Sequence, residues 1–224
     1  MQSPPAVVRA LHADERAFAA SGDPRYARHR QALLRAVGRS PRLAAAVVRL
    51  APGERDDVLA RRDLERLAWG SPPLRAQIRV GRAAAPSRLL RWYREGERRF
   101  GVRWQLLAAV NLVESAFGKV RNTSTAGAQG PMQFLPATWR AYGLGGDVHD
   151  PHDAILGAAN YLAANGAARD ERRALYHYNH SSLYVDAVLH YAHRITHVRY
   201  AFAEYYSWAV YLRTPTGEKR VTVP

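Results

Sequence analysis

Apolar residues recur at helical spacing through the first 80 positions of the chain, as at Val7, Val8 and Leu11. Such spacing places the apolar side chains on one face of a helix. Turn-forming residues separate the groups, so the pattern predicts several short helices. Asp23 followed by Pro24 predicts a capped helix start. The later groups are Leu33, Leu34 and Val37, then Leu43, Val47 and Leu50, then Val58, Leu59, Leu64 and Leu67.

The apolar pattern weakens between Gly81 and Pro86 and then restarts strongly. Residues 87–100 predict an amphipathic helix. Residues 102–117 follow it and are apolar on most sides, with Gly118 as the expected stop. We therefore expect a domain boundary near residue 85, with an N-terminal helical segment over 1–85 and a second domain over 86–206.

Two further features complete the predicted fold. Asp150 and Asp170 predict the starts of two helices, over 151–165 and 174–178, and a long helix is expected from 182 to 206. The last residues, 207–224, alternate with period two around a Pro-Thr-Gly turn, which predicts a β-hairpin. The chain is thus expected to be mainly α with a C-terminal hairpin.

The chain is strongly basic, with 33 Lys and Arg against 19 Asp and Glu and a net charge of +14. This balance favours a polyanionic partner such as nucleic acid, anionic lipid or an anionic cell-wall polymer. The absence of cysteine excludes disulfides and thiolate metal sites. No segment approaches the ~20 apolar residues that a membrane helix needs.

Glu114 is the first candidate for chemistry because no other acid lies between it and Asp147. It falls in the last turn of the predicted 102–117 helix. Burial among apolar side chains raises the pKa of a carboxyl group, and the partial negative charge of a helix C-terminus acts in the same direction. A carboxyl group tuned in this way can protonate a glycosidic oxygen.

The residues around Glu114 form a recognisable pattern. Glu114-Ser115 is followed by Ser124, ten residues after the Glu, and then by Gly-Ala-Gln-Gly-Pro-Met132-Gln133-Phe134. Later come the pairs Tyr178-Asn179 and Tyr184-Val185. Together these motifs, spread over about residues 87–205, resemble the lytic transglycosylase branch of the lysozyme-like superfamily. Pro131 stands where that family usually has Leu.

The resemblance implies a lysozyme-like helical domain that cleaves bacterial peptidoglycan without water and leaves 1,6-anhydromuramic ends. It implies that Glu114 is the single general acid and base, supported by Ser124 and Tyr178. It also implies substrate contacts from a set of neighbouring residues and no metal or organic cofactor. The implied substrate-binding residues are Ser115, Met132, Gln133, Phe134, Asn179 and Tyr184.

Two alternatives stay open at this point. A hydrolysing glycosidase needs a second carboxylate, for which Asp147 and Asp150 are candidates, although Asp150 is better explained as a helix cap. A non-catalytic module that binds glycan or cell wall is the other alternative. The expected partners are peptidoglycan strands and anionic wall polymers, with no nucleic acid and no transmembrane segment. The expected location is extracytoplasmic, with an export signal absent from this sequence.

His190, His193 and His197 lie three and four residues apart, a spacing that can hold a metal ion on a helix. No carboxylate completes the set nearby and no His-Glu-x-x-His motif occurs, so a polar helix face is the favoured interpretation.

Overall fold

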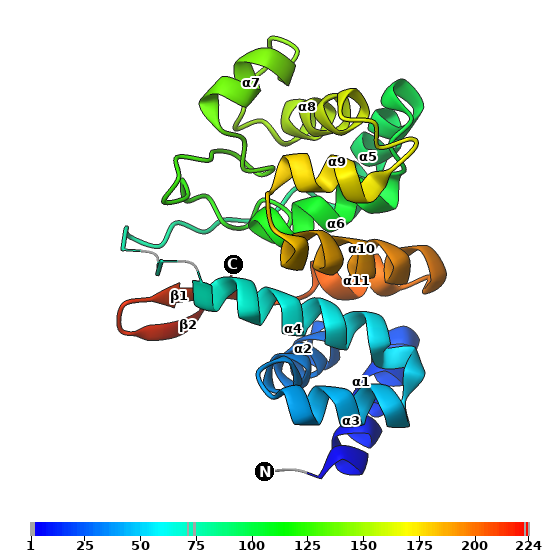
Figure 1. Cartoon of the computed structure of the whole chain (residues 1–224). Coiled ribbons are helices and arrows are strands. Elements are labelled where there is room, and N and C mark those ends of the chain that lie inside the picture. Colours follow the sequence, from blue (N-terminus) through cyan, green and yellow to red (C-terminus); the bar gives the residue numbers. More distant parts are fainter. Residues whose placement is uncertain (1–2, 71, 74, 222, 224) are drawn as a thin grey trace. The chain divides into compact units, whose positions relative to one another are not determined.

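The computed structural model of the chain describes residues 3–70, 72–73, 75–221 and 223. This described part contains eleven α-helices, one short 3-10 helix and one two-stranded antiparallel sheet (Figure 1). The predicted mainly α fold with a C-terminal hairpin is confirmed. The chain divides into two compact units, and each unit combines segments that are distant in sequence.

The first unit combines residues 1–71 with residues 181–209. Within it, α10 packs lengthwise along α4, as Figure 1 shows. Its core contains the predicted apolar positions Leu11, Leu34, Val47 and Val58, all of which are fully buried. Its elements are α1 (Pro4–Ser21), α2 (Pro24–Gly38), α3 (Pro41–Leu50), η1 (Pro52–Glu54), α4 (Arg55–Gly70), α10 (Ser182–His197) and α11 (Ala201–Tyr206).

Helix starts in this unit follow the sequence signals closely. The carboxylate of Asp23 accepts a hydrogen bond from the backbone N–H of Arg25, and Pro24 occupies the first turn of α2. Such a cap satisfies a backbone donor that has no partner within the helix. The predicted capped start of this helix is therefore confirmed.

The expected long helix over 182–206 is wrong, because the chain breaks into α10 and α11 at Val198, whose backbone is extended. In one continuous helix Arg194 and Glu204 would lie about 15 Å apart along the axis. The break instead brings Arg194 Nη2 to 2.8 Å from Glu204 Oε2. The ion pair and the two-helix geometry therefore depend on each other.

The second unit combines residues 72–180 with residues 210–224. Within it, α5 packs against both α6 and α8. The backbone between 75 and 85 is largely irregular and forms one isolated antiparallel bridge, Val80 with Val120. The elements are α5 (Pro86–Phe100), α6 (Trp104–Ser115), α7 (Pro136–Tyr142), α8 (Pro151–Ala164), α9 (Glu171–Tyr178), β1 (Val210–Thr214) and β2 (Gly217–Val221).

Helix α6 ends two residues earlier than expected, at Ser115 rather than at Phe117. Ala116, Phe117 and Gly118 all have positive φ, between 52° and 82°, so the helix cannot continue through them. The hydroxyl of Ser115 accepts a hydrogen bond from the backbone N–H of Gly118 and thereby stabilises the turn. Glu114 consequently lies in the last turn of α6, as predicted.

The C-terminal hairpin pairs Val210 with Val221 and closes at Thr214 and Gly217. The compact units divide the chain after residues 71, 180 and 209. These points differ from the boundaries at 85 and 206 that we expect for domains, and the domain limits stay a prediction.

Candidate active site

The candidate acid Glu114 is half-buried at the C-terminal end of α6, a helix whose residues 106–112 are all buried. Tyr178, the last residue of α9, lies close enough to interact electrostatically with it. Burial, followed by the negative charge of Glu114, raises the pKa of Tyr178 well above its usual value. The phenol therefore keeps its proton at neutral pH and donates a hydrogen bond to the carbonyl of Met132, at 2.7 Å.

Met132 and Gln133 belong to a tight four-residue loop, residues 130–133, which contacts Tyr178 through the Met132 carbonyl. Gln129 and Phe134 close the loop with two backbone hydrogen bonds of 2.8 Å. Gly130 has φ of 73°, and a Cβ at this position would lie 1.9 Å from the carbonyl oxygen of Val148. Only glycine fits such a close approach with positive φ. The loop shape thus depends on Gly130.

A buried chain of hydrogen bonds ties this loop to the helices behind it. The hydroxyl of Tyr93 in α5 donates to Asn111 Oδ1 in α6, at 2.7 Å. Asn111 Nδ2 and Ser115 Oγ both donate to the carbonyl oxygen of Pro131, at 2.8 and 2.5 Å. Because these groups are buried, each hydrogen bond is costly to lose. They hold the loop at a fixed distance from the helix that carries Glu114.

An aromatic cluster lies beside the loop and joins three helices to it. Phe134 contacts the rings of Trp139, Tyr161 and Tyr178, with centroid separations of 5.1, 6.4 and 5.9 Å. Tyr161 also packs edge-on against Tyr142 and Tyr178. Edge-to-face pairs at these separations are favourable beyond the area that they bury. The contacts with Phe134 and Tyr161 thus help to fix the position of the Tyr178 ring.

Residues 92–194 match the transglycosylase SLT domain family. The chain contains an SLT domain. Comparison with curated proteins and with solved structures gives no significant match. The matched segment begins within α5, includes Glu114 and Tyr178, and ends within α10. The predicted resemblance to a lytic transglycosylase of the lysozyme-like superfamily is confirmed by this match. The match also indicates a peptidoglycan-related activity.

The SLT domain distributes the predicted substrate-binding residues between its surface and its interior. Gln133 and Asn179 are half-buried, and each has a polar side chain at the surface. A second group is shielded from solvent in this structure, and the substrate contacts expected of its members stay a prediction. These are Ser115, Met132, Phe134 and Tyr184, with exposed fractions of 2, 0, 3 and 1%.

Two predicted residues make contacts that differ from their expected roles. Ser124 uses its hydroxyl to accept a hydrogen bond from the N–H of Ala128, so it shapes its own loop. Its orienting effect on Glu114 stays a prediction. Tyr184 lies in α10, which belongs to the first compact unit, and its contact with substrate also stays a prediction.

The carboxylates considered as a second catalytic group are engaged in local structure. Asp150 caps α8 by accepting hydrogen bonds from the N–H groups of His152 and Asp153, which confirms the helix-cap interpretation. Asp147 accepts from the N–H of His149 in an exposed loop. Both side chains therefore have structural explanations that need no catalytic role.

The histidines of α10 meet a carboxylate that the local sequence does not contain. His190 Nδ1 and His193 Nδ1 lie 2.8 and 2.6 Å from the two carboxylate oxygens of Asp56, in α4. Within the described residues no cluster of three or more His, Asp or Glu has an arrangement suited to a metal ion. The same described residues contain no helix with both the length and the apolar character that crossing a membrane requires.

Sequence reasoning did not identify Tyr93, Asn111 and Tyr161 as parts of the site. Asn111 is the single amide within the otherwise apolar stretch 106–113, and such an isolated polar residue is a usable signal. Its partners lie 18 and 20 residues away, at Tyr93 and Pro131. The aromatic partners of Phe134 come from three different helices, so no local pattern could have indicated them.

Proposed function

We propose that the SLT domain cleaves the β-1,4 bond between N-acetylmuramic acid and N-acetylglucosamine in peptidoglycan, without water, with Glu114 as the single general acid and base. The observation that carries the proposal is the position of Glu114. It is a half-buried carboxyl at the end of α6, in electrostatic contact with Tyr178 and inside the SLT match. Such a proposal also places the site of action outside the cytoplasm, where peptidoglycan lies.

The proposed reaction has two proton transfers. Glu114 donates its proton to the glycosidic oxygen while the bond from that oxygen to the muramic C1 breaks, which releases the 4-hydroxyl of N-acetylglucosamine. The muramic C6 hydroxyl then attacks C1, and its proton returns to the Glu114 carboxylate. The product is a 1,6-anhydro ring, and no atom is gained or lost. One carboxyl group suffices because it acts as acid and then as base.

The neighbouring groups have supporting roles in this scheme. Tyr178, with its raised pKa, stays neutral and keeps the Met132 carbonyl in place, which holds the loop near Glu114. Gln133 anchors itself by donating from Nε2 to the carbonyl of Gly130, at 3.0 Å. Its side-chain oxygen and the amide of Asn179 are the groups that we assign to hydrogen bonding with the sugars. The buried apolar side chains of Met132 and Phe134 help to exclude water that would otherwise compete with the C6 hydroxyl.

The experiment that tests the proposal is the variant Glu114→Gln with purified peptidoglycan as substrate. The change keeps the shape of the side chain and removes the proton transfer, so cleavage should fall about 100- to 10 000-fold. The melting temperature should not decrease, which would show that the fold is intact. Full activity in this variant would refute the assignment.

The products separate the lyase from the hydrolase. Reaction in heavy-oxygen water should leave the new ends unlabelled and lighter by one water than hydrolysis products. Asp147→Asn serves as the matched control: it should retain activity in the lyase scheme and lose it if Asp147 is a second catalytic carboxylate. Glycan binding by the wild-type chain without any turnover would favour a non-catalytic module.

A further inference from the structure

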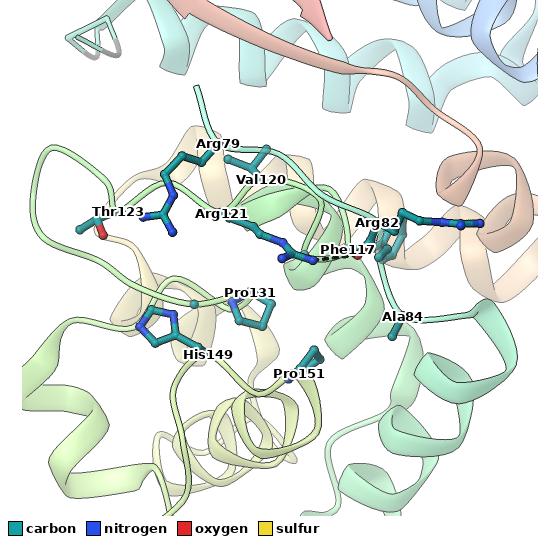
Figure 2. A pocket seen from close by; sticks show the side chains of 13 residues that line it. Arg79, Arg82, Ala84, Phe117, Val120, Arg121, Thr123, Pro131, His149 and Pro151 are labelled. Atoms are coloured by element: carbon teal, nitrogen blue, oxygen red, sulfur yellow. Dashed lines mark hydrogen bonds between the residues drawn. The ribbon is translucent and has the colours of Figure 1, made fainter. Parts of the chain in front are cut away.

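A second feature of the SLT-containing unit is a pocket of about 340 Å³ that is rich in arginine (Figure 2). Its walls come from residues 79–84, from the loop that follows α6 and from residues 149–151. Arg79, Arg121 and His149 contribute charge or polarity, and Phe117 and Pro131 contribute apolar surface. Residues 79–84 precede the SLT match, so the pocket combines part of the matched domain with a segment that lies before it.

The backbone places two of the arginines directly opposite each other. Val80 and Val120 form an antiparallel bridge, which makes Arg79 and Arg121 the adjacent cross-strand pair. The N–H of Arg121 donates to the carbonyl of Arg79, at 2.9 Å. Cross-strand partners point to the same face, and like charges in that position destabilise the pairing. An anion bound in the pocket would reduce this repulsion.

No acidic residue lines the pocket, so the positive charge is not neutralised locally. In Figure 2 the side chains of Arg79 and Arg121 extend in different directions, that of Arg79 toward the side of Thr123 and that of Arg121 toward the backbone of Arg82, and the guanidinium group of Arg82 points away from both. Arg121 Nη2 donates to the backbone carbonyl of Arg82, at 3.3 Å, which leaves its other donors available. Arginine side chains that line one pocket without an acidic residue are suited to a carboxylate or a phosphate.

The guanidinium group of Arg121 packs directly against Gly81, which has no side chain. A Cβ on Gly81 would lie 2.5 to 2.7 Å from three guanidinium atoms of Arg121. An alanine at position 81 would therefore displace the guanidinium group without changing the net charge of the chain. Since the displaced atoms are the end of a flexible side chain, the fold should tolerate the change.

We propose that this pocket binds a carboxylate of the peptide arm of peptidoglycan, an inference that rests on the proposed function. The pocket is bounded by Phe117 and Gly118, just after Glu114, and by Gly130 and Pro131, just before Met132. The peptide arm is attached to the muramic sugar, which is the sugar at the proposed scissile bond. A carboxylate of that arm is therefore the anion that the reaction itself brings to these two loops.

The test compares soluble glycan chains that carry peptide arms with the same chains after an amidase has removed the arms. In Arg79→Gln/Arg121→Gln, KM for the peptide-bearing chains should rise about tenfold, with kcat nearly unchanged, because a charge-assisted contact is lost. On peptide-free chains the double variant and the wild type should be equal. Arg88→Gln, an exposed arginine outside the pocket, is the control with no expected effect.

Gly81→Ala sharpens the test because it moves a guanidinium group without removing charge. It should raise KM for peptide-bearing chains several-fold, which a general charge effect would not do. Equal losses on both substrates, or no loss in the double variant, would overturn the proposal.

Direct binding separates this proposal from the proposed function. By calorimetry, a free muramoyl peptide should bind wild-type protein, and the same peptide with amidated carboxyl groups should not. If the wild-type chain cleaves neither substrate yet binds the acidic peptide through Arg79 and Arg121, the pocket assignment stands and the enzymatic function fails. Binding of inorganic phosphate or a phosphodiester wall polymer in place of the peptide would overturn the carboxylate assignment.

Discussion

The two compact units use arginine in opposite ways. In the first unit Arg30 is fully buried and pairs with Asp57 and Glu204, each at 2.7 Å, and with Glu54 at 2.5 Å. In the second unit Arg79 and Arg121 are exposed around a pocket that no acid lines. The same side chain is thus an internal cross-link in one unit and a candidate ligand group in the other.

The difference lies in how charge is balanced. In the first unit two guanidinium groups, those of Arg30 and Arg194, meet four carboxylates, those of Glu15, Glu54, Asp57 and Glu204. The surplus is negative and is enclosed by protein. In the pocket the surplus is positive and open to solvent. An enclosed surplus is compensated by protonation, whereas an open one is compensated by binding an anion.

The largest stability effect is expected at Arg30. Arg30→Met would remove the ion pairs of three buried carboxylates, two of which keep Arg194 as a partner, and should lower the free energy of unfolding by about 3 to 5 kcal/mol. Urea denaturation followed by circular dichroism measures the change. Arg121→Gln removes the same charge from an exposed position and should change stability by less than about 0.5 kcal/mol. Equal effects of the two variants would contradict the proposed contrast.

A pH-dependent effect is expected from Glu54. Burial, against the opposing attraction of Arg30, raises the pKa of Glu54 from its usual 4.5 to about 7. Because the folded state binds this proton more tightly than the unfolded chain, the stabilisation is complete below about pH 4.5 and is lost as pH rises through about 7. The loss is roughly 3 kcal/mol, since each pKa unit corresponds to about 1.4 kcal/mol.

Glu54→Gln tests this pH dependence because the amide resembles the protonated acid and does not titrate. Unfolding free energies from about pH 5 to about pH 8 should fall less steeply in the variant than in the wild type. Asp147→Asn, which changes an exposed loop acid, should leave the slope unchanged. Equal slopes in Glu54→Gln and the wild type would show that Glu54 does not take up this proton on folding.

A smaller effect is expected in the neutral network of the second unit. Asn111→Leu removes the acceptor of Tyr93 and one donor to the Pro131 carbonyl, at a cost of about 2 kcal/mol. Adding Tyr93→Phe should recover part of this loss, because it removes the hydroxyl that lost its acceptor. Thermal denaturation of the two single variants and the double variant measures the coupling. Strict additivity would mean that the two side chains do not act as a pair.

Local signals in the sequence were sufficient for most helix positions. Apolar spacing located α1 to α5, and the carboxylates Asp23, Asp150 and Asp170 marked helix starts where each accepts backbone hydrogen bonds. The hairpin followed from its period-two pattern. These features depend on contacts within a few residues, which a linear pattern contains. The errors at the ends of α6 and α10 arose where side-chain contacts and backbone conformation override an apolar pattern that continues. Helix α9 begins at Glu171, three residues before its predicted start, and α7 was not predicted.

The site was predictable in its chemistry and less so in its geometry. Glu114 stood out through its isolation among acids and through the motif around it, and its place in the last turn of α6 follows from local pattern. The support given by Tyr93 and Asn111, and the burial of Met132 and Phe134, depend on packing between elements. Motifs indicate which residues are present, and packing decides which of them reach solvent.

By itself, the amino-acid sequence determined the helical character of this protein, its surplus of arginine and its single isolated acid. The tertiary structure alone decided which arginines are neutralised. Arg30 meets Glu204 across 174 residues, and Arg79 meets Arg121 through one backbone bridge between segments 40 residues apart. The physical reason is that Coulomb interactions depend on distance in space and on burial, neither of which a net charge or a local pattern specifies.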